Sequence, residues 1–193
     1  SIVEDLRHCH WEDYSDLKFD IIKRDLKKTL KKAGKIDYSL FPPTFRWHLC
    51  SSRLSQGKFD NWDGWEFRSN WSITFQGLNG FNLKVPKWDG KPVKKLVIAS
   101  EQGIGDEIMF ASMLPDLLKT NDVVFECHKR LKTLFEKSFP SVSIYGTREQ
   151  EEVDWAQNHK IDYRISIGSL GKFYRRSADK FTGESYLKAD PLA

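Results

Sequence analysis

The stretch that decides the fold is Lys94-Lys95-Leu96-Val97-Ile98-Ala99-Ser100-Glu101-Gln102-Gly103-Ile104-Gly105-Asp106-Glu107-Ile108-Met109-Phe110. Its apolar run from Leu96 to Ala99 contains β-branched residues, which predicts a central parallel strand covered on both faces. Gly103 and Gly105 permit a sharp turn, and the two acidic residues that follow fall where a helix begins. In open α/β sheets ligands bind beyond the carboxyl ends of strands, so this turn is the predicted functional site.

Strands and helices alternate after this turn. Further strands are predicted at 123–127, 142–145 and 163–167, with helices at 131–139 and 149–158 between them. The helix after the turn is expected to bury one apolar face and to be interrupted at Pro115; that face comprises Ile108, Ala111, Ser112, Leu114, Leu117 and Leu118. The alternation predicts an α/β fold, a Rossmann-like parallel sheet over residues 94–193 with right-handed crossovers.

The N-terminal part of the chain is predicted to be helical. Apolar spacing and turn residues favour helices at 1–35, 44–56 and 61–71, with Gly57 ending the second of them. Two helices joined by a glycine turn, with aromatic residues between them, are typical of a tetratricopeptide hairpin. We therefore expect a tetratricopeptide-like segment at 1–75 and a turn-rich linker at 76–93.

Composition argues against a nucleic-acid or membrane protein. The formal net charge is only +4, and the lysines concentrated in 23–35 are expected to form a solvated helix face. No run reaches the roughly eighteen apolar residues of a membrane span, so no transmembrane segment is expected. The sequence begins with Ser1 rather than Met, which suggests a piece of a longer polypeptide.

Cysteine and histidine usage predicts neither disulfides nor a metal site. Cys9, Cys50 and Cys127 are odd in number and far apart, which indicates reduced thiols in a cytoplasmic protein. His8 and His10 flank Cys9, but adjacent residues do not converge on one tetrahedral ion. No metal and no resident cofactor are therefore expected.

Three interpretations of the glycine turn compete. A dinucleotide site needs a third glycine where this chain has Ile108, and Asp106 would lie close to the pyrophosphate. A phosphate loop needs a Gly-Lys-Ser/Thr ending, which this turn lacks. A group-transfer site needs a base to accept the proton of an attacking hydroxyl, and Asp106 is suitably located for that role. The structural alternative is that Asp106 only caps its helix.

The turn and its flanks also resemble a known family. Four segments resemble bacterial tetratricopeptide-repeat proteins. The two main ones are Pro86-Lys87-Trp88-Asp89-Gly90 and 96–111. The flanking ones are Gly64-Trp65-Glu66-Phe67-Arg68 and Tyr186-Leu187-Lys188-Ala189-Asp190-Pro191. The C-terminal region of those proteins is similar to family 9 glycosyltransferases, the lipopolysaccharide heptosyltransferases. The resemblance covers roughly residues 55–193, and its most specific part is Glu101-Gln102-Gly103-Ile104-Gly105-Asp106.

The resemblance implies the N-terminal, acceptor-side lobe of a two-lobed GT-B fold. By the same resemblance, Asp106 would be the catalytic base that activates an acceptor hydroxyl. We expect the other substrate-binding residues to be Glu101, Gln102, Gly103, Ile104, Gly105 and Glu107. The chain departs from the heptosyltransferases at Glu101-Gln102, where small hydroxylated residues are usual, so the acceptor is expected to differ.

The resemblance also implies that half of the enzyme lies outside this chain. The second lobe binds most of the nucleotide-sugar donor in that family, and the sequence stops at Ala193, so an isolated lobe is expected to be inactive. The predicted function is sugar transfer from a nucleotide sugar to a glycan or protein acceptor. Arg175 and Arg176 either contact phosphates or are solvated surface residues. The alternative function is a non-catalytic protein-interaction module that binds a protein partner through its helical hairpin and retains a degenerate transferase-like scaffold.

Overall fold

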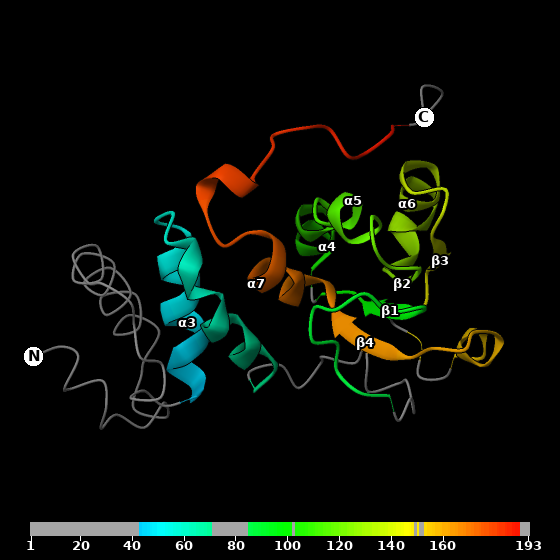
Figure 1. Cartoon of the computed structure of the whole chain (residues 1–193), viewed down its shortest axis with the longest axis horizontal. Helices are drawn as coiled ribbons and strands as arrows, with labels where there is room; N and C mark the ends of the chain where they lie inside the picture. Colours follow the sequence, from blue (N-terminus) through cyan, green and yellow to red (C-terminus); the bar gives the residue numbers. More distant parts are fainter. Residues whose placement is uncertain (1–42, 71–84, 102, 149, 151–152, 190–193) are drawn as a thin grey trace, which may run out of the picture. The chain divides into compact units, whose positions relative to one another are not determined.

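The computed structural model describes residues 43–70 and 85–189, except 102, 149 and 151–152 (Figure 1). The chain divides into two compact units, Ser1–Ile73 with Arg175–Phe181, and Thr74–Tyr174 with Thr182–Ala193. The predictions for 1–35, including the lysine-rich face and His8, Cys9 and His10, lie outside the described residues. Within the described part, no helix combines the length and apolar character needed to cross a membrane.

The first unit contains the predicted helix–turn–helix segment in modified form. Helix α3 (Pro43–Leu54) ends in a left-handed turn at Gly57, whose φ is 75°, as the sequence predicted. The amide of Gly57 donates to the Leu54 carbonyl (2.9 Å), and the amide of Lys58 donates to the Arg53 carbonyl (3.1 Å). These two bonds satisfy carbonyl groups at the helix end, and only a residue that tolerates positive φ fits there.

The second helix differs from its prediction. The structure has a 3₁₀ helix, η3 (Phe59–Asn70), interrupted by non-helical backbone at Asn61. The Asn61 side-chain amide donates to the Lys58 carbonyl (3.1 Å), a local bond that competes with regular α-helix. Aromatic rings nonetheless pack between α3 and η3. The ring centroids of Trp47 on α3 and Trp65 on η3 lie 6.3 Å apart, and Trp62 of η3 lies 6.0 Å from Trp65 by the same measure. The tetratricopeptide assignment stays a prediction.

The second unit is built on the parallel sheet that the sequence predicted. Its strands are β1 (Leu96–Ala99), β2 (Val123–Glu126), β3 (Ser143–Tyr145) and β4 (Tyr163–Ser166), in the order β3-β2-β1-β4. All neighbouring strands pair in parallel, and β1 lies between β2 and β4. The strand order therefore reverses between β1 and β4. This unit is a mixed α/β structure around a four-stranded parallel sheet.

Helices follow the strands and cover the sheet. Figure 1 shows α4 (Ile104–Ala111), α5 (Leu114–Leu117) and α6 (Lys132–Ser138) together on one side of it. On this side Phe125 packs against Phe135, with ring centroids 5.2 Å apart. Val97 and Val124 instead join a cluster with Trp155 and the adjoining alanine. Since successive strand residues point to opposite faces, both faces of β1 and β2 are buried.

The helices after the turn confirm part of the prediction, since Ala111, Leu114 and Leu117 are buried as expected, and correct another part. Pro115 restarts the helix as expected, since α5 carries it in its first turn. The buried face is shifted, however: Glu107, Phe110 and Met113 are buried, while Ile108 and Ser112 are only half-buried. The sequence pattern missed this face because a glutamate occupies a core position.

Short helical segments complete the described residues. The predicted helix at 149–158 is limited, in its described part, to the 3₁₀ helix η5 (Trp155–Asn158). The 3₁₀ helix η4 (Lys129–Leu131) leads into α6. After β4 the chain forms η6 (Ile167–Leu170) and α7 (Gly171–Tyr174), which the sequence did not predict because two glycines lower helix propensity there. In the first unit, η7 (Ala178–Lys180) is a single turn.

Residues 85–93 pack against the sheet. Lys87 forms a parallel bridge with Arg164 of β4, and the Trp88 amide donates to the Arg164 carbonyl (2.9 Å). The Trp88 side chain is buried, and its ring lies 4.9 Å from that of Phe173. Gly90 has a φ of 96°, and a Cβ there would lie 2.6 Å from the Phe173 ring. The Trp-Asp-Gly sequence therefore has a structural role at this edge.

Replacing Gly90 by alanine is expected to lower the free energy of unfolding by about 2 kcal/mol or more, from unfavourable positive φ and displacement of Phe173. Chemical denaturation measures the change. Gly105→Ala is the matched control, because a Cβ at 105 meets nothing within 4 Å and its φ is not positive. Equal stability of the two variants would contradict this account.

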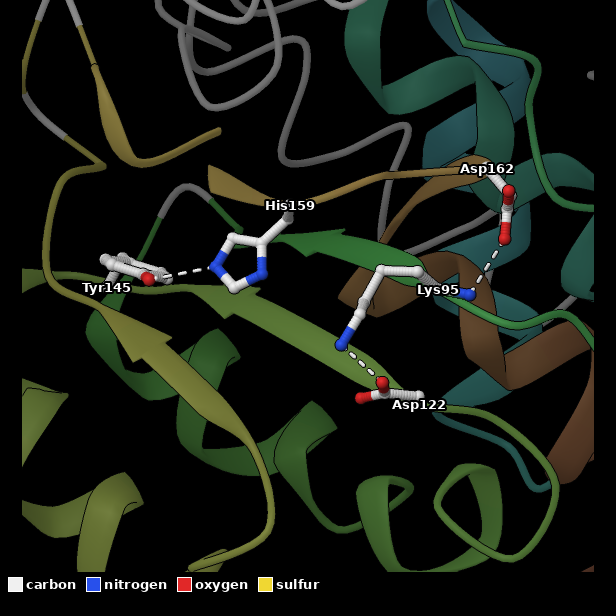
Figure 2. Close-up of polar contacts among 5 residues, drawn as sticks. All are labelled: Lys95, Asp122, Tyr145, His159 and Asp162. Carbon is white, nitrogen blue, oxygen red and sulfur yellow. Dashed lines mark hydrogen bonds and ion pairs between the residues drawn. The ribbon is translucent and has the colours of Figure 1, made fainter. Parts of the chain in front are cut away.

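The amino edge of the sheet is fixed by polar contacts (Figure 2). The Lys95 amide donates to Asp162 Oδ2 (2.9 Å), and the Asp162 amide donates back to the Lys95 carbonyl (3.0 Å). The Lys95 ammonium group also pairs with Asp122. Elsewhere in Figure 2, the hydroxyl of Tyr145 lies 2.9 Å from His159 Nε2. The Lys95 contacts fix the starts of β1, β2 and β4 at the edge opposite to the glycine turn.

Candidate functional site

The candidate site lies at the carboxyl edge of the sheet. The strand order reverses between β1 and β4, and in α/β sheets ligands bind outside the carboxyl ends of the strands at such a switch point. Ser100 to Gly103 leave β1 here and lead into α4. The predicted glycine turn therefore occupies the position at which this class of fold binds ligands.

Asp106 lies in the first turn of α4, as predicted for a helix start. The N-cap residue is Gly103, and no side chain caps this helix by a hydrogen bond. Asp106 is half-buried, and its Oδ2 lies 2.8 Å from the position that a Cβ on Gly103 would occupy. The absence of a side chain at Gly103 is what allows the Asp106 carboxylate to lie over the loop.

Replacing Gly103 by alanine is expected to displace the Asp106 carboxylate with little loss of stability. The new Cβ would meet the end of a flexible side chain rather than backbone, and φ at 103 is −110°, which alanine adopts readily. Denaturation should show a change within about 1 kcal/mol. NMR of the Asp106 side chain should show its displacement. An unmoved carboxylate would show that Asp106 does not lie against position 103.

The neighbouring residues of the turn differ in their surroundings. Gly105 is exposed, with open space around the position of a Cβ, and Ile104 is half-buried. Neither positive φ nor packing in the described structure requires glycine at 105. Gln102, predicted to bind substrate, lies outside the described residues. The turn thus presents Gly105 and its backbone to solvent at the start of α4.

Glu107 points into the protein. It is fully buried, its Oε2 accepts a hydrogen bond from the His128 amide (2.8 Å), and its Oε1 pairs with Arg148 Nη1 (2.8 Å). Burial raises the pKa of Glu107 to about 7, against the lowering effects of the His128 amide and Arg148. The structure places this predicted substrate-binding residue behind the loop.

Glu101 also lies inside the carboxyl edge. Its side chain is 4% exposed, and its Oε1 accepts a hydrogen bond from the Gly168 amide (2.9 Å). Its carbonyl oxygen accepts a hydrogen bond from Arg148 Nη1 (2.6 Å). Glu101 therefore connects the loop after β1 to the segment after β4, across the switch point.

A third buried carboxyl group, Glu126, was not singled out from the sequence. It ends β2, is 2% exposed, and accepts a hydrogen bond from the Thr147 hydroxyl (3.1 Å) at Oε1. Thr147 in turn accepts from Trp155 Nε1 (3.0 Å). Burial raises the pKa of Glu126 to about 8, so its carboxyl is neutral at pH 7. The sequence signal that could have identified Glu126 is its position directly after three apolar strand residues.

Comparison with known proteins gives one partial match. The chain is similar to Protein FlbA of Caulobacter vibrioides (strain ATCC 19089 / CIP 103742 / CB 15), with 31% identity over 145 residues. The match covers 67% of this chain but 24% of FlbA, so the chain spans about a quarter of the length of that relative. No family model matches the sequence, and no solved structure matches it.

The structure also describes the other residues considered from the sequence. Arg175 is buried in the first unit, where its carbonyl accepts from Trp62 Nε1 (2.7 Å), and Arg176 lies 3.9 Å from Asp63. Cys127 is a buried free thiol whose pKa burial raises to about 12, which suits packing rather than nucleophilic attack. Among the described residues, no cluster of side chains suits a metal ion.

The arrangement suits proton transfer by a carboxylate at the start of α4. Asp106 is the half-buried carboxylate of the turn, whereas the acidic residues before and after it, Glu101 and Glu107, are buried and hydrogen-bonded. A base must be held within hydrogen-bond reach of the proton it accepts. The structure provides such a carboxylate on an anchored helix start.

Proposed function

We propose that this chain is the acceptor-side lobe of a glycosyltransferase related to the family 9 heptosyltransferases, within a two-lobed GT-B enzyme. The observation that carries the proposal is the half-buried Asp106 at the switch point, on a loop anchored by Glu101 and Glu107. The parallel sheet with reversed order between β1 and β4 is consistent with such a lobe. Residues 1–75 act as a tetratricopeptide-like segment in this proposal.

The proposed reaction transfers a sugar from a nucleotide sugar to a hydroxyl group of a glycan or protein acceptor. The acceptor oxygen forms a bond to the anomeric carbon of the sugar while the bond from that carbon to the phosphate oxygen breaks. Asp106 accepts the proton of the attacking hydroxyl, and the nucleoside diphosphate leaves with the bonding electron pair. Gly103, Ile104 and Gly105 form the surface that the acceptor approaches, and a second lobe supplies most of the donor site.

In the same proposal the protein acts in the cytoplasm, where buried thiols such as those of Cys50 and Cys127 stay reduced. The match covers 24% of Protein FlbA, so this longer relative is a place to look for the second lobe. No metal or tightly bound cofactor takes part in the step described above.

The decisive experiment uses the complete gene product and nucleotide sugars of stated composition, including UDP-N-acetylglucosamine, GDP-mannose and an ADP-activated heptose. Transfer is measured by mass spectrometry of released nucleoside diphosphate with cell-surface glycan extracts as acceptors. Release that depends on both donor and acceptor supports the proposal. Absence of release with every donor, in a folded protein, would overturn it.

A binding measurement separates the proposal from the competing interaction module. In NMR titrations, shifts centred on the amides of 103–107 upon addition of a nucleotide sugar or acceptor support the transferase. Shifts confined to 44–71 upon addition of peptides from candidate protein partners support the module instead. The module hypothesis depends on the packed aromatic pair Trp47 of α3 and Trp65 of η3.

A further inference from the structure

A network of hydrogen bonds and one ion pair joins the carboxyl ends of all four strands. Glu107 of α4 binds the His128 amide after β2 and the Arg148 guanidinium after β3. Arg148 also donates to the carbonyl of Glu101 after β1. The Glu101 carboxylate then accepts from the Gly168 amide after β4. The loop that carries Asp106 is therefore connected to every neighbouring strand end.

The central contacts of this network are short and shielded from water. Arg148 Nη1 lies 2.8 Å from Glu107 Oε1 and 2.6 Å from the Glu101 carbonyl oxygen. The side chain of Glu107 is 0% exposed and that of Arg148 is 14% exposed. Hydrogen bonds to charged groups are stronger than neutral ones, and low local dielectric strengthens them further. Loss of either partner would leave the other charge buried without its main counter-charge.

We propose that Glu107 and Arg148 form a positioning pair that holds the Gly103–Asp106 loop in place. Asp106 and Glu107 are adjacent in the first turn of α4, so a restraint on the Glu107 side chain also restrains the backbone of Asp106. The Glu107 amide donates to the Gly103 carbonyl (3.0 Å), which extends the restraint to the N-cap of the helix. The catalytic consequence rests on the proposed function; the restraint on the loop does not.

The charge balance around the pair distinguishes it from an ordinary surface ion pair. Three carboxyl groups at this edge, those of Glu101, Glu107 and Glu126, are buried, and Arg148 is the cation that contacts Glu107. By contrast, Lys132 and Glu136 on α6 form an exposed pair at 3.5 Å, with both side chains 47% exposed. Exposed pairs contribute little, so this second pair is a matched control.

Hydrogen exchange tests the restraint in the chain itself. In Glu107→Gln and in Arg148→Met, the amides of 107–111, which form the intrahelical bonds of α4, should exchange at least about tenfold faster relative to the amides of Val97 and Val124. The double variant should show no further increase, because both changes remove one interaction. Glu136→Gln should leave the ratio unchanged. A uniform change across the sheet and the loop, or no change, would overturn the positioning role.

A conservative variant tests whether geometry as well as charge matters. Arg148→Lys keeps the positive charge but supplies a point charge in place of a planar fork. It should restore part of the protection lost in Arg148→Met, because an ammonium group replaces the guanidinium contact with Glu107. Exchange in Arg148→Lys no slower than in Arg148→Met would show that the ion pair does not hold the loop.

Kinetics of the complete gene product tests the catalytic consequence. Glu107→Gln should lower kcat at least about tenfold with KM for the nucleotide sugar within about twofold, and should cost nothing more when Asp106→Asn is already present. Equal losses in both backgrounds would show that Glu107 does not act through Asp106. If Asp106→Asn alone changes nothing, the base assignment of the proposed function fails, and hydrogen exchange alone decides the positioning role.

Discussion

Turnover by the complete gene product is expected to fall at least about a hundredfold when Asp106 is replaced by asparagine. Asparagine has almost the same shape as aspartate but cannot accept the proton of an attacking hydroxyl. The side chain lies half-buried over Gly103, so the isosteric change leaves the loop intact. The measurement is kcat for transfer from a nucleotide sugar, with circular dichroism and the denaturation midpoint showing that the fold is retained.

Asp122→Asn is the control for this variant. Asp122 lies at the opposite, amino edge of the sheet, where it pairs with Lys95, and its side chain is 53% exposed. The control removes one carboxylate from the same domain without touching the turn, so kcat should stay within about twofold. Unchanged turnover in Asp106→Asn would remove Asp106 from the mechanism.

Protein stability is expected to fall as pH rises from about 5 to about 8, because of two buried carboxyl groups, Glu126 and Glu107. Burial raises the pKa of Glu126 in the folded protein to about 8 and that of Glu107 to about 7, from an ordinary value of 4.5. Between these values the folded state holds a proton that the unfolded state has released. Stability then decreases by up to about 1.4 kcal/mol per pH unit for one such group, and it levels off above the folded pKa.

The groups that face Glu126 explain why it is the carboxyl that stays neutral. Thr147 donates to it and Arg148 lowers its pKa, but Glu107 opposes ionisation and burial dominates. Glu107 has Arg148 at 2.8 Å and the His128 amide at 2.8 Å as direct partners. The pKa of Glu126 is therefore raised further than that of Glu107, and Glu126 keeps its proton to the higher pH.

Glu126→Gln should remove the part of this pH dependence that Glu126 contributes, which dominates between pH 7 and pH 8, and leave the part from Glu107. Glutamine mimics the neutral acid, so the variant should match the parent at pH 5 and exceed it at pH 8 by at least about 2 kcal/mol. Urea denaturation at a series of pH values measures both. Glu136→Gln, on the exposed side of α6, should leave the slope as it is in the parent. A parent protein whose stability is flat over this range would contradict the buried neutral carboxyl.

The sequence was sufficient to predict the elements that depend on local patterns. Apolar runs predicted β1 and β2, because buried parallel strands need continuous β-branched and aliphatic residues. The strands β3 and β4, which contain Ser143 and Arg164 and are less buried, were also predicted. Gly57 predicted the end of α3 and Pro115 predicted the restart at α5, since each residue constrains its own backbone. The location of Asp106 at a helix start beyond β1 followed from the same local logic.

The tertiary structure alone decided which acidic residues face inward. Hydropathy assigns Glu101, Glu107 and Glu126 to the surface, yet all three are buried, because partners distant in sequence satisfy them. Glu107 meets an amide 21 residues away, and Glu101 meets one 67 residues away. A parallel sheet collects the carboxyl ends of its strands at one edge, and no local pattern records which loop groups meet there. The chain itself determines a strand, a glycine turn and an aspartate, whereas the packing of four strand ends determines that this aspartate stands on an anchored loop.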